Sequence, residues 1–166
     1  MTHPKASRPF MPGYGISEGE EGLLPWSWAV ERLEKSHNYW VMTVRPDGRP
    51  HAMPVWGVWL DGRYFFSTAR TSRKASNLAD NANCVVCTEG ATEAVIVEGE
   101  AEVVSDHAVL RPVWEAYSAK YSWDLTGESM FAVSPRTAFA FIEKPKEFEA
   151  SATRWRFSFP PPPAAV

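Results

Sequence analysis

Two aspartate–glycine pairs, Asp47-Gly48 and Asp61-Gly62, divide residues 39–68 into three short apolar runs. Asp-Gly pairs favour the tight turns that join neighbouring antiparallel strands. The runs between them, "YWVMTV", "HAMPVWGVWL" and "YFFST", are rich in the β-branched and aromatic residues typical of strands. This stretch therefore predicts a three-stranded antiparallel meander over residues 39–44, 51–60 and 64–68, with Pro54 marking an edge, a bulge or an interruption of backbone hydrogen bonding.

The rest of the chain adds strands and a few short helices. Ser27 is the expected cap of the first helix, Ser105 or Asp106 begins the last one, and Pro112 shifts its first full turn to about Arg111. The predicted helices cover residues 27–36, 72–80 and 105–121, and the further strands cover residues 84–88, 93–104, 129–134 and 137–143. Six or seven strands in hairpin connections with two or three inserted helices predict a mainly β protein, a small antiparallel barrel.

Length and composition fit one globular domain of 166 residues with a 45% hydrophobic fraction. We expect an extended N-terminal arm at residues 1–25, a folded domain at 26–157 and a proline-rich tail at 158–166, whose prolines 160–163 favour a polyproline conformation. The net charge of −3 gives no electrostatic support for nucleic-acid or membrane-surface binding. The longest apolar runs are short and broken by polar residues, so no transmembrane helix is expected. The N-terminus lacks the continuous apolar stretch of a secretory signal and the chain has only two cysteines, so a cytoplasmic location is expected.

The cysteine pair in "NCVVCT" is expected to be structural. Cys84 and Cys87 lie three residues apart on a predicted strand, so their side chains point to opposite faces and do not share a metal ion or a disulfide. No second such pair is present in the sequence, and the histidines have no metal-ligand spacing. The sequence also lacks the motifs of serine hydrolases, zinc proteases and P-loop proteins.

A hydroxyl-and-cation cluster lies where the third strand of the meander gives way to a helix. Ser72 is a good helix cap, and Arg73 and Lys74 follow it directly. Unpaired backbone amides at a helix start, a hydroxyl and two cations are suitable donors for one anion, and Asn77 lies on the same helical face as Arg73. The alternative is a capped surface helix with solvated cations, and the local pattern leaves both interpretations open.

Two other features have more than one interpretation. On the strand 51–60, alternation separates His51, Met53 and Val55 from Ala52, Pro54 and Trp56, and because neither face is cleanly polar, we expect both to be covered, as at a subunit interface. In "TRWRF", the side chains of Arg154 and Arg156 face one way and Trp155 the other. Trp155 either covers a planar anionic ligand or packs into the core.

The order of these motifs resembles the pyridoxamine 5′-phosphate oxidase-like split β-barrel proteins, and more narrowly their flavin/deazaflavin oxidoreductase branch. The residues that carry the resemblance are "TVRPDGRPHAMPVW", "SRKASNL" and "TRWRF", within a match from about Trp26 to Phe157. The resemblance implies a cofactor in a groove between two subunits of a homodimer. The expected contacts are Met53, Pro54, Val55 and Trp56 at the ring, Phe66, Ser67 and Thr68 along the ribityl chain, and Ser72, Arg73 and Lys74 at the phosphate, with Asn77 nearby and Trp56 or Trp155 on the substrate side.

The expected function is hydride transfer from reduced F420, or from FMN as second choice, to an unsaturated or quinone-like small molecule. No catalytic side chain is assigned, because such a cofactor carries the chemistry and the protein orients it. The C-terminal R-x-H residues of true pyridoxamine phosphate oxidases have no match here, which argues against vitamin B6 oxidation. The alternatives are an FMN-binding oxidase-like protein, a cofactor carrier, and a haem or tetrapyrrole binder with His51 or His107 as axial ligand.

Overall fold

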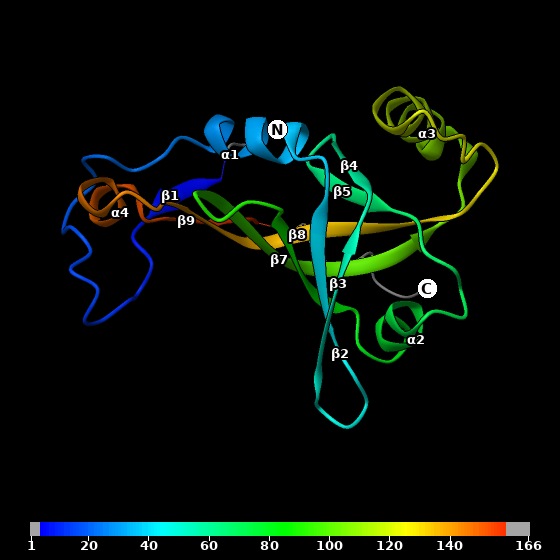
Figure 1. Ribbon diagram of the computed structural model, residues 1–166, viewed down its shortest axis with the longest axis horizontal. Coiled ribbons are helices and arrows are strands. Elements are labelled where there is room, and N and C mark those ends of the chain that lie inside the picture. The colour runs from blue at the N-terminus through cyan, green and yellow to red at the C-terminus, as the bar shows by residue number, and fades with distance from the viewer. Residues whose placement is uncertain (1–3, 159–166) are drawn as a thin grey trace.

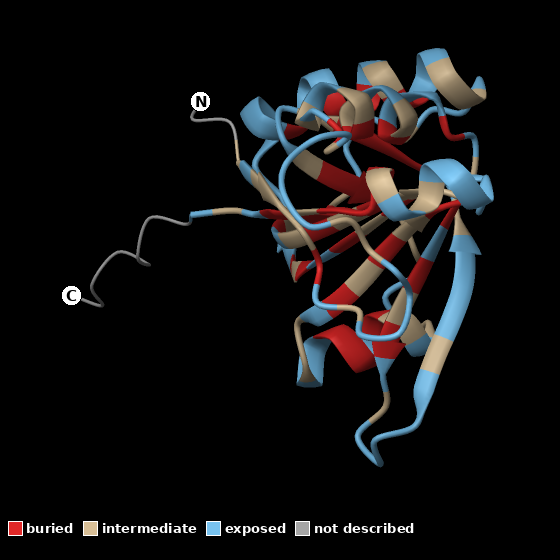
Figure 2. Ribbon diagram, turned by 90° about the vertical axis from the view of Figure 1, so that its left-hand side faces the viewer, coloured by how far each residue is buried: buried red, intermediate tan, exposed pale blue. Residues whose placement is uncertain are grey.

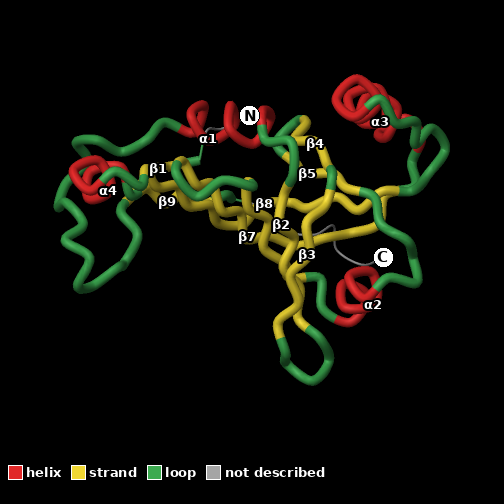
Figure 3. The backbone as a smooth tube through the Cα atoms, viewed as in Figure 1, coloured by secondary structure: helices red, strands yellow, loops and turns green. Residues whose placement is uncertain are grey.

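The computed structural model describes residues 4–158, and within that range all nine strands form one antiparallel sheet (Figures 1 and 3). Its strand order is β1-β9-β8-β7-β6-β2-β3, and the β4–β5 hairpin joins through β5 to β8. The sheet is not closed into a complete cylinder, which is the split form of a barrel. The predicted fold class is therefore confirmed. The expected proline-rich conformation of residues 160–163 lies outside the described residues.

Nine strands and four helices make up this part of the chain. The strands are β1 (Lys5–Ser7), β2 (Tyr39–Val44), β3 (Pro50–Val55), β4 (Gly57–Leu60), β5 (Arg63–Phe66), β6 (Asn83–Thr88), β7 (Glu93–Val104), β8 (Met130–Ile142) and β9 (Thr153–Arg156). The helices are α1 (Trp26–Lys35), α2 (Arg73–Asp80), α3 (His107–Tyr121) and α4 (Pro145–Ser151). Neither β1 nor α4 was predicted from the sequence, and β1 lies within the expected N-terminal arm, where it pairs with β9.

The predicted strand over residues 51–60 is wrong, because the chain changes partner at Trp56. β3 pairs with β2 up to Val55, whereas β4 begins at Gly57 and pairs with β5. A strand's alternation pattern continues across such a junction, since both halves are extended, so the pattern alone does not reveal the break. β3 pairs only with β2 and is mostly exposed (Figure 2), so the expectation that both of its faces are covered is not met within one chain.

In residues 129–143 the prediction was wrong in the opposite sense. Two strands were predicted there, but the structure has the single strand β8. Pro135 was expected to interrupt pairing, but it lies opposite Gly99 at a register shift between Glu98 and Gly99 in β7. A bulge of this kind accommodates a residue without an N–H group. A Cβ on Gly99 would lie 2.9 Å from Val133 Cγ1 and closer still to the Ser134 carbonyl oxygen, so glycine allows the two backbones to approach.

The helix starts were predicted with mixed success. Asp106 caps α3 by accepting a 2.8 Å hydrogen bond from the Ala108 amide, and the helix begins at His107 rather than near Arg111, with Pro112 inside it. Pro25, not Ser27, precedes α1, and no side chain caps that helix. Because α1 already begins at Trp26, Ser27 lies inside its first turn and is not in the capping position.

Two apolar clusters build the core. The larger lies between α1 and the inner face of the sheet and includes Leu33, Tyr39, Val97 and Trp155, and the smaller lies under α3 and includes Phe65, Leu110 and Trp114. Figure 2 shows the buried residues concentrated along the inner strands.

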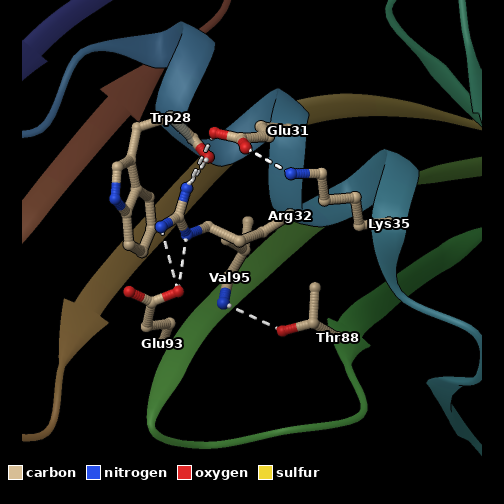
Figure 4. Close-up of polar contacts among 7 residues, drawn as sticks. All are labelled: Trp28, Glu31, Arg32, Lys35, Thr88, Glu93 and Val95. Atoms are coloured by element: carbon tan, nitrogen blue, oxygen red, sulfur yellow. Dashed lines mark hydrogen bonds and ion pairs between the residues drawn. The ribbon is translucent and has the colours of Figure 1, made fainter.

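Polar contacts fix α1 to the β6–β7 hairpin (Figure 4). The Arg32 guanidinium lies 3.7 Å from the centre of the Trp28 ring and forms a 2.9 Å ion pair with Glu93. Within the hairpin, the Val95 amide donates to Thr88 Oγ1 over 3.1 Å. The Arg32–Glu93 ion pair therefore holds α1 against the start of β7, over the face of the sheet that carries the larger core cluster.

The junction at Gly57 requires glycine for space. A Cβ at this position would lie 2.5 Å from the Phe65 carbonyl oxygen and in contact with the Tyr64 hydroxyl. Gly57→Ala is therefore expected to lower the free energy of unfolding by about 3 kcal/mol, as for overpacking against a fixed backbone. Gly90→Ala is the control, because a Cβ added there would have no atom within 4 Å. Urea denaturation checks this prediction, and equal stability of the two variants would contradict it.

Candidate cofactor site

Unpaired cations gather at the start of α2. Within residues 4–158, the side chains of Arg45, Arg73 and Lys74 have no hydrogen bond or ion pair, and Arg45 Nε is buried without a partner. The carboxylate of Asp47, in the same β2–β3 turn as Arg45, is bound by Arg49 at 2.7 Å. Burial lowers the pKa of Lys74. Unpaired cations with a buried donor provide the charge that an anion such as phosphate requires.

His51 lies within reach of all three cations. Its pKa is lowered, first by burial and then by the charges of Arg45, Lys74 and Arg73, so its imidazole is kept neutral more readily than usual. Its Nδ1 lies 3.5 Å from Thr43 Oγ1. His51 was predicted from the sequence only as an alternative axial ligand. Arg45 was not predicted as a site residue, because it has the sequence context of an ordinary turn residue.

Asn77 and Ser72 both have structural partners. Asn77 is fully buried and donates a 2.9 Å hydrogen bond to Thr43 Oγ1, which joins α2 to β2, while its Oδ1 atom has no partner in the described chain. Ser72 Oγ accepts from the Ala75 amide at 3.2 Å and from Thr68 Oγ1 at 3.1 Å. The predicted cap at Ser72 is thus confirmed. The expected ligand contacts of Ser72 and Asn77 stay predictions.

The two faces of β3 differ in their neighbours. Met53 and Val55 lie on the same face as His51, opposite the β2 residues Val41 and Tyr39 in the sheet register. That face is the one from which α2 reaches Thr43. Met53 is 43% exposed, so an apolar side chain is available at an open edge beside the cations.

The opposite face of β3 continues an exposed apolar surface. Pro54 lies opposite Trp40 and Pro50 lies opposite Val44. Trp40 and Val44 are 42% and 39% exposed, which is unusual for such large apolar side chains. Trp56, at the β3–β4 junction, is 41% exposed.

The segment after β5 leads from the buried strand to the cations at the start of α2. Phe66 is fully buried, and its ring is stacked 5.3 Å from that of Phe131. Ser67 and Thr68 are half-buried in the connection that leads to α2. Backbone and hydroxyl groups at residues 67–68 are thus placed between the buried strand and the cations.

Trp155 is not part of this surface. Its side chain is fully buried and packs edge-on against Trp26 at 5.2 Å. Its cross-strand neighbours are Ala138 and Ala6, whose small side chains leave room for the indole ring. Of the two interpretations of Trp155, the structure therefore supports packing in the core, and the single chain presents no face of this residue to a ligand.

Arg154 and Arg156 face the other way, toward an open groove of about 640 Å³ beside β1 that Lys5 and Ser7 also line. Arg154 donates to Ser7 Oγ at 3.2 Å. The two arginines therefore lie apart from the cations of α2, at the opposite end of the sheet (Figure 1).

A polar cluster at the C-terminal end of α3 had no signal in the sequence. Lys120 and Tyr121 contact Gly57, Tyr39 and His37, which are 63 or more residues away along the chain. Burial lowers the pKa of Lys120 to about 8, opposed by the charge of Glu89. Burial raises the pKa of Tyr121 to about 12.

The lowered pKa of Lys120 predicts a pH effect on stability. Between about pH 8 and the ordinary lysine pKa of 10.5, the unfolded chain binds a proton at Lys120 that the folded chain lacks. The unfolding free energy of the wild type relative to Lys120→Met is therefore expected to rise with pH across this window. Denaturation of both proteins from pH 7 to 10 checks this, and a difference that falls with pH would contradict it.

Neither a metal centre nor a membrane helix is found in the described part of the chain. No group of three or more His, Cys, Asp or Glu side chains there is arranged to hold a metal ion. No described helix is long and apolar enough to cross a membrane. Cys84 and Cys87 are free, and burial raises their thiol pKa values to about 12 and 11, as expected for inert structural thiols.

The open antiparallel sheet, with α1 and α3 packed against its strands, defines a split β-barrel protein. The family model described as "Pyridoxamine 5′-phosphate oxidase" matches residues 29–149, more than half of the chain. The chain therefore belongs to the pyridoxamine 5′-phosphate oxidase family, as the resemblance predicted.

Solved structures share this fold at low sequence identity. A conserved hypothetical protein from Mycobacterium tuberculosis has a TM-score of 0.65 and 19% identity, over 78% of this chain and 91% of its own. A protein named F420 reductase has a TM-score of 0.52 and 21% identity, over 65% and 93%. The haem storage protein HutZ from Vibrio cholerae has a TM-score of 0.55 and 18% identity, over 64% and 86%. No curated protein matches the chain.

Proposed function

We propose that this protein binds F420, or FMN as second choice, and transfers hydride to an unsaturated or quinone-like small molecule. The observation that carries the proposal is the group of unpaired cations, Arg45, Arg73 and Lys74, beside the exposed edge strand β3 in the described part of the chain. The similarity to the F420 reductase supports the choice of cofactor only through the shared fold.

The chemical character of the side chains fits such a cofactor. The unpaired guanidinium and ammonium groups suit its phosphate, and the buried Arg45 Nε, which has no partner among residues 4–158, is a donor that a phosphate oxygen would satisfy. Met53 and Val55, on the same face of β3 as His51, and Trp56, which follows β3, offer apolar surface for a planar ring, and the half-buried Ser67 and Thr68 lie in the connection that leads to α2. The cofactor supplies the hydride chemistry when bound, and the chain holds and orients it.

Titration of the purified protein tests this function. F420 and FMN are added separately, and binding is followed by fluorescence quenching. Micromolar binding of F420 with weaker binding of FMN is the expected result, and no binding of either cofactor overturns the proposal. Turnover with enones, quinones and tetrapyrroles then separates an enzyme from a carrier, since tight binding without reduction of any substrate favours the carrier.

Haem binding is the second candidate, and His51 favours it. Its imidazole is held toward the neutral form and lies among three cations that suit the carboxylates of haem. HutZ, a haem storage protein, shares the fold. A haem titration decides this candidate: a shifted Soret band that is lost in His51→Ala supports it, whereas a band unchanged by that substitution excludes His51 as the ligand.

A homodimer is part of the proposal. The exposed apolar surface of Trp40, Val44, Ala52 and Pro54 lies on the face of the β2–β3 hairpin opposite to His51, so a second copy can cover it without filling the cation site. Val44→Glu places a charge on this surface and is expected to shift a dimer to monomer, while Val103→Glu, at a 51% exposed valine on β7, is the control. Sedimentation velocity measures the result, and a wild-type monomer would contradict it.

A further inference from the structure

Side chains at the C-terminal end of α3 hydrogen-bond both the amide and the carbonyl group of Gly57. The Gly57 amide donates to Tyr121 Oη over 3.0 Å. The same hydroxyl lies 2.7 Å from the His37 carbonyl oxygen and 2.8 Å from that of Gly57, so its single proton is shared between these two acceptors. A backbone amide at the start of a strand is thus satisfied by a side chain from another element.

Lys120 makes three further contacts at the same place. Its ammonium group donates to Tyr39 Oη at 2.8 Å, to the Gly57 carbonyl at 3.2 Å and to the Glu34 carbonyl at 3.3 Å. Each of its three N–H groups therefore has an acceptor. These acceptors come from α1, β2 and β4, so one side chain ties three elements to the end of α3.

Trp56, the residue before Gly57, is stacked on the ring of Tyr121. The ring centres are 4.8 Å apart and the planes differ by 7°. His37 packs edge-on against both rings, at 6.2 Å from Trp56 and 5.3 Å from Tyr121. Because Tyr121 covers one face of the indole while Trp56 stays 41% exposed, the uncovered part of the indole faces outward.

We propose that Lys120 and Tyr121 are positioning residues that fix the β3–β4 junction and present the Trp56 indole as a flat wall to the ring of the bound cofactor. This inference rests on the proposed function. The strand ladder leaves Trp56 itself without a partner strand, since β3 pairs with β2 up to Val55 and β4 pairs with β5 from Gly57. The side chains of α3 supply the missing constraint. An aromatic side chain that is already ordered loses little conformational entropy when the ligand binds, which favours affinity.

Hydrogen exchange tests the clamp without any cofactor. Tyr121→Phe keeps the stacked ring and removes only the hydroxyl, so exchange of the Gly57 amide is expected to accelerate about tenfold or more. Lys120→Met keeps the aliphatic stem and has a similar effect, and Lys120→Arg restores protection. Tyr117→Phe is the matched control, because Tyr117 packs 4.7 Å from Tyr121 on the same helix and its hydroxyl is not among the groups that bind Gly57. Unchanged exchange in Tyr121→Phe overturns the clamp.

Paired ligands test the link to the ring. FMN is compared with riboflavin, and F420 with its phosphate-free deazaflavin chromophore. Tyr121→Phe is expected to weaken both members of a pair by the same factor, about tenfold, because it acts at the ring. Arg73→Ala with Lys74→Ala weakens only the phosphate-bearing member.

Three outcomes overturn the positioning role: faster exchange with unchanged affinities, loss of affinity for the phosphate-bearing ligand alone, or equal loss in Tyr117→Phe. A wild type that binds none of the four ligands refutes the proposed function and the positioning role with it. The exchange measurement still decides in that case whether α3 clamps Gly57, so the two failures are distinguishable.

Discussion

Replacing Arg73 and Lys74 together with alanine is expected to weaken the binding of F420 and FMN at least about tenfold, or roughly 1.4 kcal/mol. Both cations lack partners within the described chain, so neither is needed for an existing ion pair there. Their loss removes charge-assisted hydrogen bonds to a phosphate and leaves the fold nearly unchanged. Fluorescence titration measures the affinity, and thermal denaturation shows that stability is preserved.

The matched control removes two cations of a different kind. Lys35 and Lys144 are exposed and already paired, with Glu31 at 2.5 Å and Glu147 at 3.3 Å. Lys35→Ala with Lys144→Ala changes the net charge equally, so it corrects for long-range attraction of an anionic ligand. Adding Arg45→Ala to the Arg73 and Lys74 double variant is expected to weaken binding further. If the Arg73 and Lys74 variant binds as tightly as the control, the phosphate lies elsewhere.

Local signals in the sequence predicted the elements well. The aspartate–glycine turns, the Ser72 and Asp106 caps and the alternation around Cys84 and Cys87 depend on residues within a few positions of one another. Capping and turn formation are local interactions, so their residue types carry the information directly. The helix over residues 72–80 was predicted within one residue for the same reason.

The partner of a strand is not determined by the residues of that strand alone, and here the sequence patterns gave wrong strand boundaries. The extended pattern of residues 51–60 is the same whether the strand keeps one partner or exchanges β2 for β5 at Trp56. Pro135 reads as a break, yet the bulge that accommodates it is created by Gly99 on another strand. Gly99 is far from Pro135 in the chain, and the exchange of β2 for β5 depends on the two neighbouring strands, so neither outcome is encoded in the pattern of the strand itself.

The residues of the candidate site also differ in whether a local sequence pattern could predict them. Arg73 and Lys74 were found because they follow a capping serine, whereas Arg45 resembles any charged turn residue until the fold brings it near His51. Lys120 and Tyr121 lie in the last turn of a helix, a common place for lysine. Their contacts with Gly57 span 63 and 64 positions, and no short pattern encodes them.

Trp155→Ala is expected to have the largest effect on stability, lowering the free energy of unfolding by about 4 kcal/mol. The indole is fully buried between α1 and the sheet, with Trp26 at 5.2 Å, and its removal leaves a cavity that two neighbouring alanines cannot fill. Trp155→Phe is expected to cost much less, because it keeps most of the aromatic volume and removes an indole N–H that has no hydrogen-bond partner among the described residues. Trp123→Ala is the control, since that tryptophan is 58% exposed.

Denaturation and cofactor titration together separate the two roles of Trp155 that the sequence allowed. If Trp155 is a core residue, the alanine variant of the protein loses stability and the phenylalanine variant keeps most of it. Any loss of cofactor affinity then follows the fraction of unfolded protein. If Trp155 instead covers the ligand, the alanine variant has an unchanged unfolding midpoint and binds F420 and FMN more weakly. Because the ring has no exposed surface in the single chain, the first result is expected. The second would require a conformation in which β9 leaves its place between β1 and β8.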